Sequence, residues 1–166
     1  ADPNFLTFFD LPLLYGDAKS ALSHLHSVVL SLRTARKYFG DEKLAVGKNI
    51  RIDNSYDATI TGVLAAFPGP MHLEFDLIES TLELAEANWW SNWWNNNLCT
   101  YLRLKPGITE SAVNPFLAGF MDKYFGEDFQ RNGNRLDLKL QAIRNVYFEN
   151  EVRYDPMRHG DRGAVN

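Results

Sequence analysis

The chain has 166 residues, 17 Lys and Arg against 21 Asp and Glu, a formal net charge of −4 and 45% hydrophobic residues. This length supports one domain or two closely joined subdomains, and the 23% charged and 13% aromatic content excludes a disordered tail, a collagen-like repeat and a coiled coil. Mild acidity without a basic patch argues against nucleic-acid binding, and no apolar run approaches the roughly 18 residues of a membrane-spanning helix.

The predicted elements at the start of the chain are short. A turn and cap signal at residues 2–4 precedes an aromatic segment, residues 5–9. Residues 11–14 are expected to be extended, because Pro12 biases its predecessor away from helix. The compact, partly β-branched run 27–31 is typical of a buried strand.

A helix and a hairpin follow this strand. Apolar residues recur on one side between Ser31 and Phe39, which predicts a helix with Gly40 at its C-terminal cap. The runs 49–53 and 58–63 are predicted to form a hairpin across the polar turn at residues 54–55.

Beyond Pro68-Gly69-Pro70 the pattern changes to alternating strands and longer helices. Three alternating runs are predicted as strands: 73–78, 99–104 and 136–140. Residues 81–87 are expected to form a short helix. A long amphipathic helix is predicted over 110–124, with Thr109 or Asn114-Pro115 at its start and Gly126 at its end. Its apolar positions are Val113, Phe116, Leu117, Phe120, Met121 and Tyr124.

The order of these elements predicts an α+β protein in two parts. The first part, residues 1–70, contains strand, helix and hairpin and is β-rich. The second, residues 71–150, has a strand–helix–strand pattern, and residues 151–166 form a polar, loosely ordered tail.

The residues that most often carry chemistry do not form a site in this sequence. Cys99 is the only cysteine, which excludes an internal disulfide, and its alternating surroundings predict a small buried residue. His24 and His26 lack a third metal ligand at motif spacing and are interpreted as surface histidines. His72 is expected to stabilise a turn.

No sequence motif of an enzyme is present. The acid pairs Asp41-Glu42 and Glu127-Asp128 are adjacent in sequence, so their side chains diverge instead of converging on a cleft. There is no nucleophile elbow, phosphate-binding loop or dinucleotide fingerprint. We therefore expect no enzymatic activity, no cofactor and no metal, and hold a hydrolase with an unrecognised site as the least favoured hypothesis.

A tryptophan and asparagine patch at residues 88–97 is the one local feature with binding potential. On a helix, Trp89 and Trp93 form one i,i+4 pair and Trp90 and Trp94 form another. We favour the interpretation that some of these rings fill a gap between the two parts. There are two alternatives: the rings contact a partner or the membrane interface, or they form a platform on which sugars stack.

The ordered set of local motifs resembles a known family. Asp2-Pro3-Asn4-Phe5 opens the set. The later matching runs are 9–17, 27–31, 35–41, 46–48, 56–63, 68–76 and 100–107. Their order and spacing are similar to the MacB-like periplasmic core domain of FtsX-family ABC transporter permeases.

This resemblance implies a fold, a location and partners. The fold is a mixed-sheet domain with a porter-like α/β part and a smaller β-rich inserted subdomain. The location is the periplasmic side of an inner-membrane protein, with the polar tail leading to a membrane helix beyond the chain. The implied partners are a cytoplasmic ABC ATPase, a second permease subunit, and a periplasmic protein or a peptide, lipid or drug substrate.

The implied function is the relay or gating of ATP-driven transport or mechanotransmission, with ATP hydrolysis on a separate cytoplasmic subunit or domain. The alternative is a free-standing periplasmic carbohydrate-binding module that uses Trp89, Trp90, Trp93 and Trp94. The family usually has a further strand–helix unit before the Asp-Pro-Asn-Phe motif, so the chain is expected to be a fragment with an unpaired sheet edge.

The matching motifs contain residues that specify the fold by local geometry. Gly40 is expected to cap a helix, Gly47 to permit a turn, and Gly62 to relieve crowding within a strand. The other motif positions in this group are Gly16, Pro68 and His72.

Overall fold

The computed structural model describes residues 1–66, 73, 75–82, 98–133 and 137–146. The chain divides into two compact units, Ala1–Asn97 and Leu98–Asn166. Several features predicted from the sequence lie outside the described residues: Pro68, His72, the tryptophan patch and the polar tail. The predicted helix at 81–87 also lies outside them beyond residue 82.

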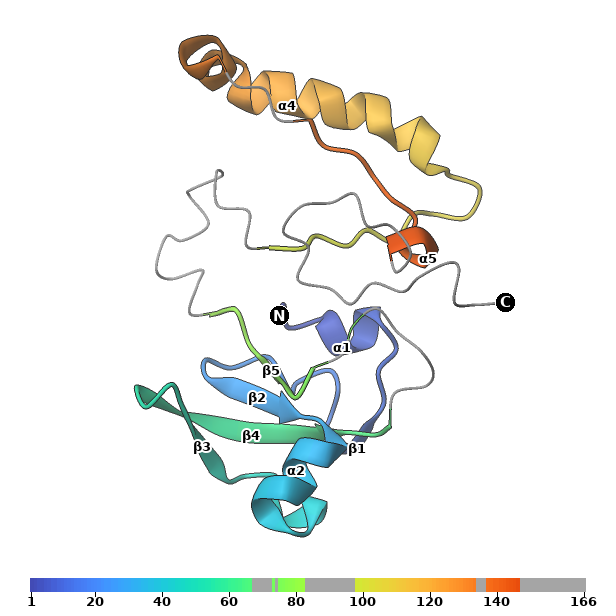
Figure 1. Ribbon diagram of the computed structural model, residues 1–166. Coiled ribbons are helices and arrows are strands. Elements are labelled where there is room, and N and C mark those ends of the chain that lie inside the picture. Colours follow the sequence, from blue (N-terminus) through green and yellow to red (C-terminus); the bar gives the residue numbers. More distant parts are fainter. Residues whose placement is uncertain (67–72, 74, 83–97, 134–136, 147–166) are drawn as a thin grey trace, which may run out of the picture. The chain divides into compact units, whose positions relative to one another are not determined.

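The first unit is built on a mixed sheet (Figure 1). Its strands are β1 (Leu13–Tyr15), β2 (Ser27–Leu30), β3 (Asn49–Ile52), β4 (Tyr56–Leu64) and β5 (Leu77–Glu79). The order is β1-β4-β2-β5, and β3 pairs with β4. β2 and β4 are parallel, whereas the other pairs are antiparallel. The predicted mixed sheet and α+β class are confirmed.

Three helical segments connect or cover these strands. They are α1 (Phe5–Phe8), α2 (Leu32–Phe39) and the 3-10 turn η1 (Glu42–Leu44). Together with β3, α2 and η1 form the crossover that the parallel pairing of β2 and β4 requires. The helix and the hairpin predicted from the sequence are therefore both present.

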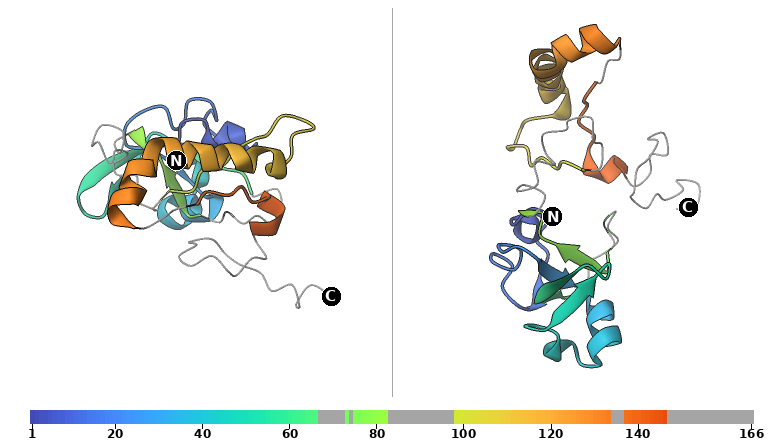
Figure 2. Two further views of the ribbon diagram at one scale, coloured as in Figure 1. Left: turned by 90° about the horizontal axis from the view of Figure 1, so that it is seen from above. Right: turned by 90° about the vertical axis from the view of Figure 1, so that its left-hand side faces the viewer.

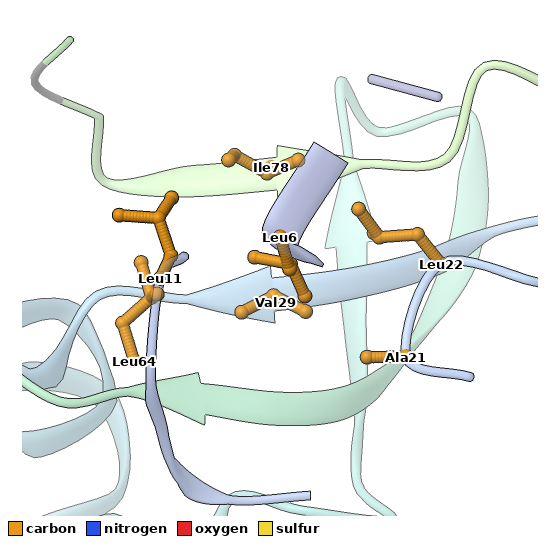
Figure 3. Packing of buried hydrophobic residues seen from close by; sticks show 7 residues of the cluster. All are labelled: Leu6, Leu11, Ala21, Leu22, Val29, Leu64 and Ile78. Atoms are coloured by element: carbon orange, nitrogen blue, oxygen red, sulfur yellow. The ribbon is translucent and has the colours of Figure 1, made fainter. Parts of the chain in front are cut away.

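The two faces of the sheet are buried by different elements, with α1 on one face and α2 on the other (Figures 1 and 2). On the α1 side, Leu6 of the helix points at Val29 of β2, between Leu22 and Leu11 (Figure 3). The core of the α2 side contains Val28, Leu30, Ala35, Ala45, Ala58, Ile60 and Val63. All four residues of β2 are buried, as expected for a central strand covered on both faces.

The strand predicted over 73–78 is shorter and lies later than expected. β5 begins at Leu77 and pairs with β2 through Ile78 opposite Val29. β5 lies after the predicted boundary at residue 70, but it belongs to the sheet of the first unit. The division into compact units falls later, after Asn97. The subdomain division at residue 70 stays a prediction.

The second unit contains α4 (Glu110–Asn132) and α5 (Ile143–Val146). α4 begins at the predicted Glu110 but continues through Gly126 to Asn132, and Gly133 follows with φ +67°. A glycine ends a helix when it adopts the left-handed conformation, as Gly133 does, whereas Gly126 within the helix costs only about 1 kcal/mol. Pro115 lies inside the helix and does not start it.

Two predicted strands of the second unit are wrong in the described residues. Residues 99–104 and 137–140 are irregular and belong to no ladder. A segment of alternating apolar and polar residues forms a strand only where a neighbouring strand supplies hydrogen bonds. The described part of this unit contains no such neighbouring strand. For the same reason the prediction of a buried Cys99 fails, since its side chain is exposed.

Candidate functional site

The predicted partner or sugar contact at Trp89, Trp90, Trp93 and Trp94 lies outside the described residues, and it stays a prediction. The same holds for the turn roles of Pro68 and His72. The candidate site is therefore built from the motif glycines, the half-buried polar cluster and the surface beside α2 in the first unit.

Gly16 and Gly62 lie where β1 meets β4. Gly16 has φ +98°, and a Cβ placed on it would overlap the carbonyl oxygen of Thr61 and lie 2.9 Å from the Cα of Gly62. A Cβ on Gly62 would lie 2.9 Å from the Cδ1 of Leu13. The register of β1 on β4 shifts between Leu13 and Tyr15, so this close backbone approach accommodates the irregularity.

Gly40 and Gly47 are turn residues with open space around them. Gly40 has φ +73° and its N–H donates to the carbonyl of Arg36 at 2.9 Å, at the C-terminus of α2. Gly47 has φ +83° and its N–H donates to the carbonyl of Ile60 at 2.8 Å. Both glycines satisfy backbone groups in a left-handed conformation that other residues adopt only with strain.

A polar cluster joins the hairpin to β5. The hydroxyl of Tyr56 donates to Oε2 of Glu79 at 2.7 Å, and Nδ1 of His26 lies 3.6 Å from Oε1 of the same carboxylate. The rings of His26 and Tyr56 contact each other at a tilt of 38°, with centroids 4.5 Å apart. His26, interpreted from the sequence as a surface residue, is in fact half-buried, whereas His24 is exposed.

This cluster has the character of a structural tie. Three elements contribute to it, because His26 precedes β2, Tyr56 starts β4 and Glu79 ends β5. In the described residues, no group of three or more His, Cys, Asp or Glu side chains could hold a metal ion. The tie was missed in the sequence because Tyr56 and Glu79 are 23 residues apart and only the sheet brings them together.

Three basic residues of α2 are exposed: Arg33, Arg36 and Lys37. Arg33 Nη2 binds Oδ1 of Asp76 at 2.8 Å, and Arg36 binds both carboxylate oxygens of Glu42 at 3.0 Å. The hydrogen bond from Arg36 lowers the pKa of Glu42 to about 2, and it raises the pKa of the Arg36 guanidinium. Hydrogen bonds from Arg33 and Thr34 likewise lower the pKa of Asp76.

A hollow of about 400 Å³ lies beside this basic surface. We call it the α2 groove. It is lined by Arg33, Thr34, Lys37 and Tyr38 of α2, by Ile50 of β3, and by Asp76 and Leu77 at the start of β5. A second hollow of about 380 Å³ shares Arg33 and includes Arg36 and Phe75. The spacing of the three cations along one helix was visible in the sequence, but the strand residues that complete the groove were not.

None of the helices in the described ranges combines the length and the hydropathy of a membrane span.

Comparison with known proteins identifies the family of the chain. Residues 1–115 match the MacB-like periplasmic core domain. No curated protein matches. The chain is similar to the crystal structure of a domain assigned to a permease protein from Porphyromonas gingivalis, with a TM-score of 0.67 and 27% identity. That match covers 88% of this chain, and the chain spans 66% of the length of the other.

The matched range contains Gly16, Gly40, Gly47 and Gly62, the described motif glycines on which the resemblance rested. The resemblance seen in the sequence is confirmed. The chain therefore belongs to the family of MacB-like periplasmic core domains, the extracytoplasmic domains of ABC transporter permeases.

Proposed function

We propose that this domain relays or gates ATP-driven transport or mechanotransmission in a permease, and that it contacts a substrate or a periplasmic partner there. The observation that carries the proposal is the family match over residues 1–115, on a fold whose tight turns use the motif glycines. The permease would act with a second permease subunit and a cytoplasmic ABC ATPase.

The construction of the first unit supports a relay. Its central strand β2 is covered on both faces and hydrogen-bonded on both edges, so a displacement applied at one end moves the sheet as a body. Chemistry on a bound substrate requires converging acid, base or nucleophilic groups. In the described residues, the cluster of His26, Tyr56 and Glu79 ties strands together.

Cys99 provides a test of location. Its side chain is exposed, so a membrane-impermeant maleimide added to spheroplasts that express the full-length permease should label it without lysis. Cys99→Ser in the same background is the control for labelling of other thiols. Labelling that requires lysis would contradict an extracytoplasmic location.

The relay itself is tested by a distance measurement. Spin labels on Cys99 of the two permease subunits, in a full-length background without other cysteines, report the separation of the two domains. We expect ATP to shift the distance distribution when the ATPase is active and to leave it unchanged with an ATPase that cannot bind nucleotide. Identical distributions with and without ATP would reject the relay.

A further inference from the structure

The lining of the α2 groove combines apolar side chains with charged ones. Tyr38 is 61% exposed and Leu77 is 36% exposed, and with Ile50 they provide apolar surface from three different elements. Exposed apolar side chains gathered around a hollow mark a contact site more often than isolated ones do. At about 400 Å³, the hollow accommodates one or two side chains of a partner.

The charges of the groove differ in how they are compensated. Arg33 is paired with Asp76, which also accepts a hydrogen bond from Thr34 Oγ1 at 3.0 Å. Arg36, beside the groove, is paired with Glu42. Lys37 forms no ion pair with any described residue, and its ammonium lies 5.7 Å from the centroid of the Tyr38 ring. Lys37 also acts on Asp76, whose pKa its charge helps to lower. The two cations Arg33 and Lys37 against the one carboxylate Asp76 leave the groove with one net positive charge beside apolar surface.

We propose that the α2 groove binds an acidic peptide segment of a partner protein, in which a carboxylate side chain is followed by an apolar one. The carboxylate pairs with Lys37 at the rim, and the apolar side chain packs between Tyr38, Ile50 and Leu77. The Asp76 carboxylate does not repel this ligand strongly, because Arg33 neutralises it at 2.8 Å.

A peptide fits this site better than a lipid surface does. The apolar residues of the groove line a hollow. A protein surface that binds a bilayer instead has apolar side chains that project outward, with several basic side chains beside them. Both Arg33 and Arg36 are already paired with carboxylates, which leaves too little free positive charge for attachment to anionic headgroups. This proposal rests on the proposed function for its partner, which would be periplasmic.

The experiment uses the 166-residue chain and the peptide acetyl-(Asp-Leu-Ser)3-amide, followed by amide chemical shifts in NMR. We expect saturable shifts at residues 33–38, 50, 76 and 77, and no such shifts with acetyl-(Asn-Leu-Ser)3-amide. Higher ionic strength should weaken the binding. Absence of saturable shifts at these positions would overturn the proposal.

Two exposed lysines give a matched pair of variants. Lys37→Glu should weaken binding of the acidic peptide by about tenfold, since it replaces attraction by repulsion at the rim. Lys43→Glu makes the same charge change on η1, outside the groove, and should change the affinity by less than about twofold. Equal losses in both variants would mean that net charge alone drives binding and would overturn the site.

Cosedimentation with phosphatidylglycerol vesicles distinguishes a lipid-binding site from a peptide-binding site. Binding to these vesicles that depends on Lys37, without peptide binding, would replace the proposal by a lipid site. The ATP-driven change in the distance between the Cys99 labels is measured independently of peptide binding. Failure of the groove to bind the peptide would therefore not contradict the proposed relay.

Discussion

At the residue scale, Gly16 is the position where the fold is least tolerant of a side chain. Its φ of +98° disfavours any other residue, and a Cβ there would meet the backbone of Thr61 and Gly62, which cannot move without breaking β4. We expect Gly16→Ala to lower the free energy of unfolding by about 3 kcal/mol, measured by urea denaturation.

Gly47 is the matched control for this substitution. It has φ +83°, and no atom lies within 4 Å of the position that a Cβ would take, so Gly47→Ala introduces backbone strain without overlap. We expect a loss of about 1 kcal/mol. Equal losses in the two variants would show that strain alone, and not the close approach of β1 to β4, makes Gly16 necessary.

The Arg36–Glu42 pair gives a prediction about acid stability. Because the folded state lowers the pKa of Glu42 from 4.5 to about 2, the folded protein binds fewer protons at this group than the unfolded chain does. The contribution of this pair to the free energy of unfolding is therefore complete above about pH 4.5, and it is lost as the pH falls towards about 2.

Arg36→Gln tests this assignment directly. Removing the guanidinium should return the pKa of Glu42 towards 4.5, as followed by the carboxyl 13C shift in an NMR titration. Arg33→Gln, which removes the partner of Asp76, serves as the control and should leave the Glu42 midpoint near 2. A Glu42 midpoint that does not move in Arg36→Gln would assign the shift to another cause.

At the element scale, α2 depends on its N-cap Ser31, which lies just before the first helical residue. Ser31 Oγ accepts the N–H of Thr34 at 3.1 Å and donates to Thr34 Oγ1 at 2.9 Å. Ser31→Ala should lower the free energy of unfolding by about 1–2 kcal/mol in thermal or urea unfolding. Ser55→Ala, in the exposed hairpin turn, should change it by less than about 0.5 kcal/mol, and a Ser31→Ala effect of that size would argue against the cap.

The helix α4 shows how periodicity can indicate an element without indicating its buried face. Met121 is buried and Val113 is half-buried, but Phe116 is 78% exposed and Tyr124 is 56% exposed. The ring of Phe120 packs on Tyr124 along the helix, with centroids 4.6 Å apart. Apolar spacing predicted the helix correctly, while the burial of each position depended on which surfaces face it.

At the scale of the whole molecule, backbone hydrogen bonding differs sharply between the two units. β2 is bonded to strands on both sides, as β4 is at Thr59 and Val63, whereas residues 99–104 belong to no ladder. We expect amides of β2 to exchange with deuterium at least about a hundredfold more slowly than those of residues 99–104, as measured by mass spectrometry.

The amides of Asp53 and Asn54 in the exposed hairpin turn provide the internal reference for fast exchange. Protection of residues 99–104 at the level of β2 would reveal strand pairing there and would restore the strand that the sequence pattern predicted.

The sequence by itself determined the elements whose signals are local. The Gly40 end of α2, the buried run of β2 and the hairpin turn each depend on residues within a few positions of one another. The ordered motifs also sufficed for the family, because their spacing follows the turns of the fold.

Only the tertiary structure decided features that depend on distant partners. It placed β5 beside β2, left the alternating run 99–104 without a ladder, and brought Glu79 to Tyr56 and Leu77 to Lys37. The physical reason is that strand pairing, side-chain ties and grooves arise between segments far apart in sequence, where periodicity carries no information about the neighbour.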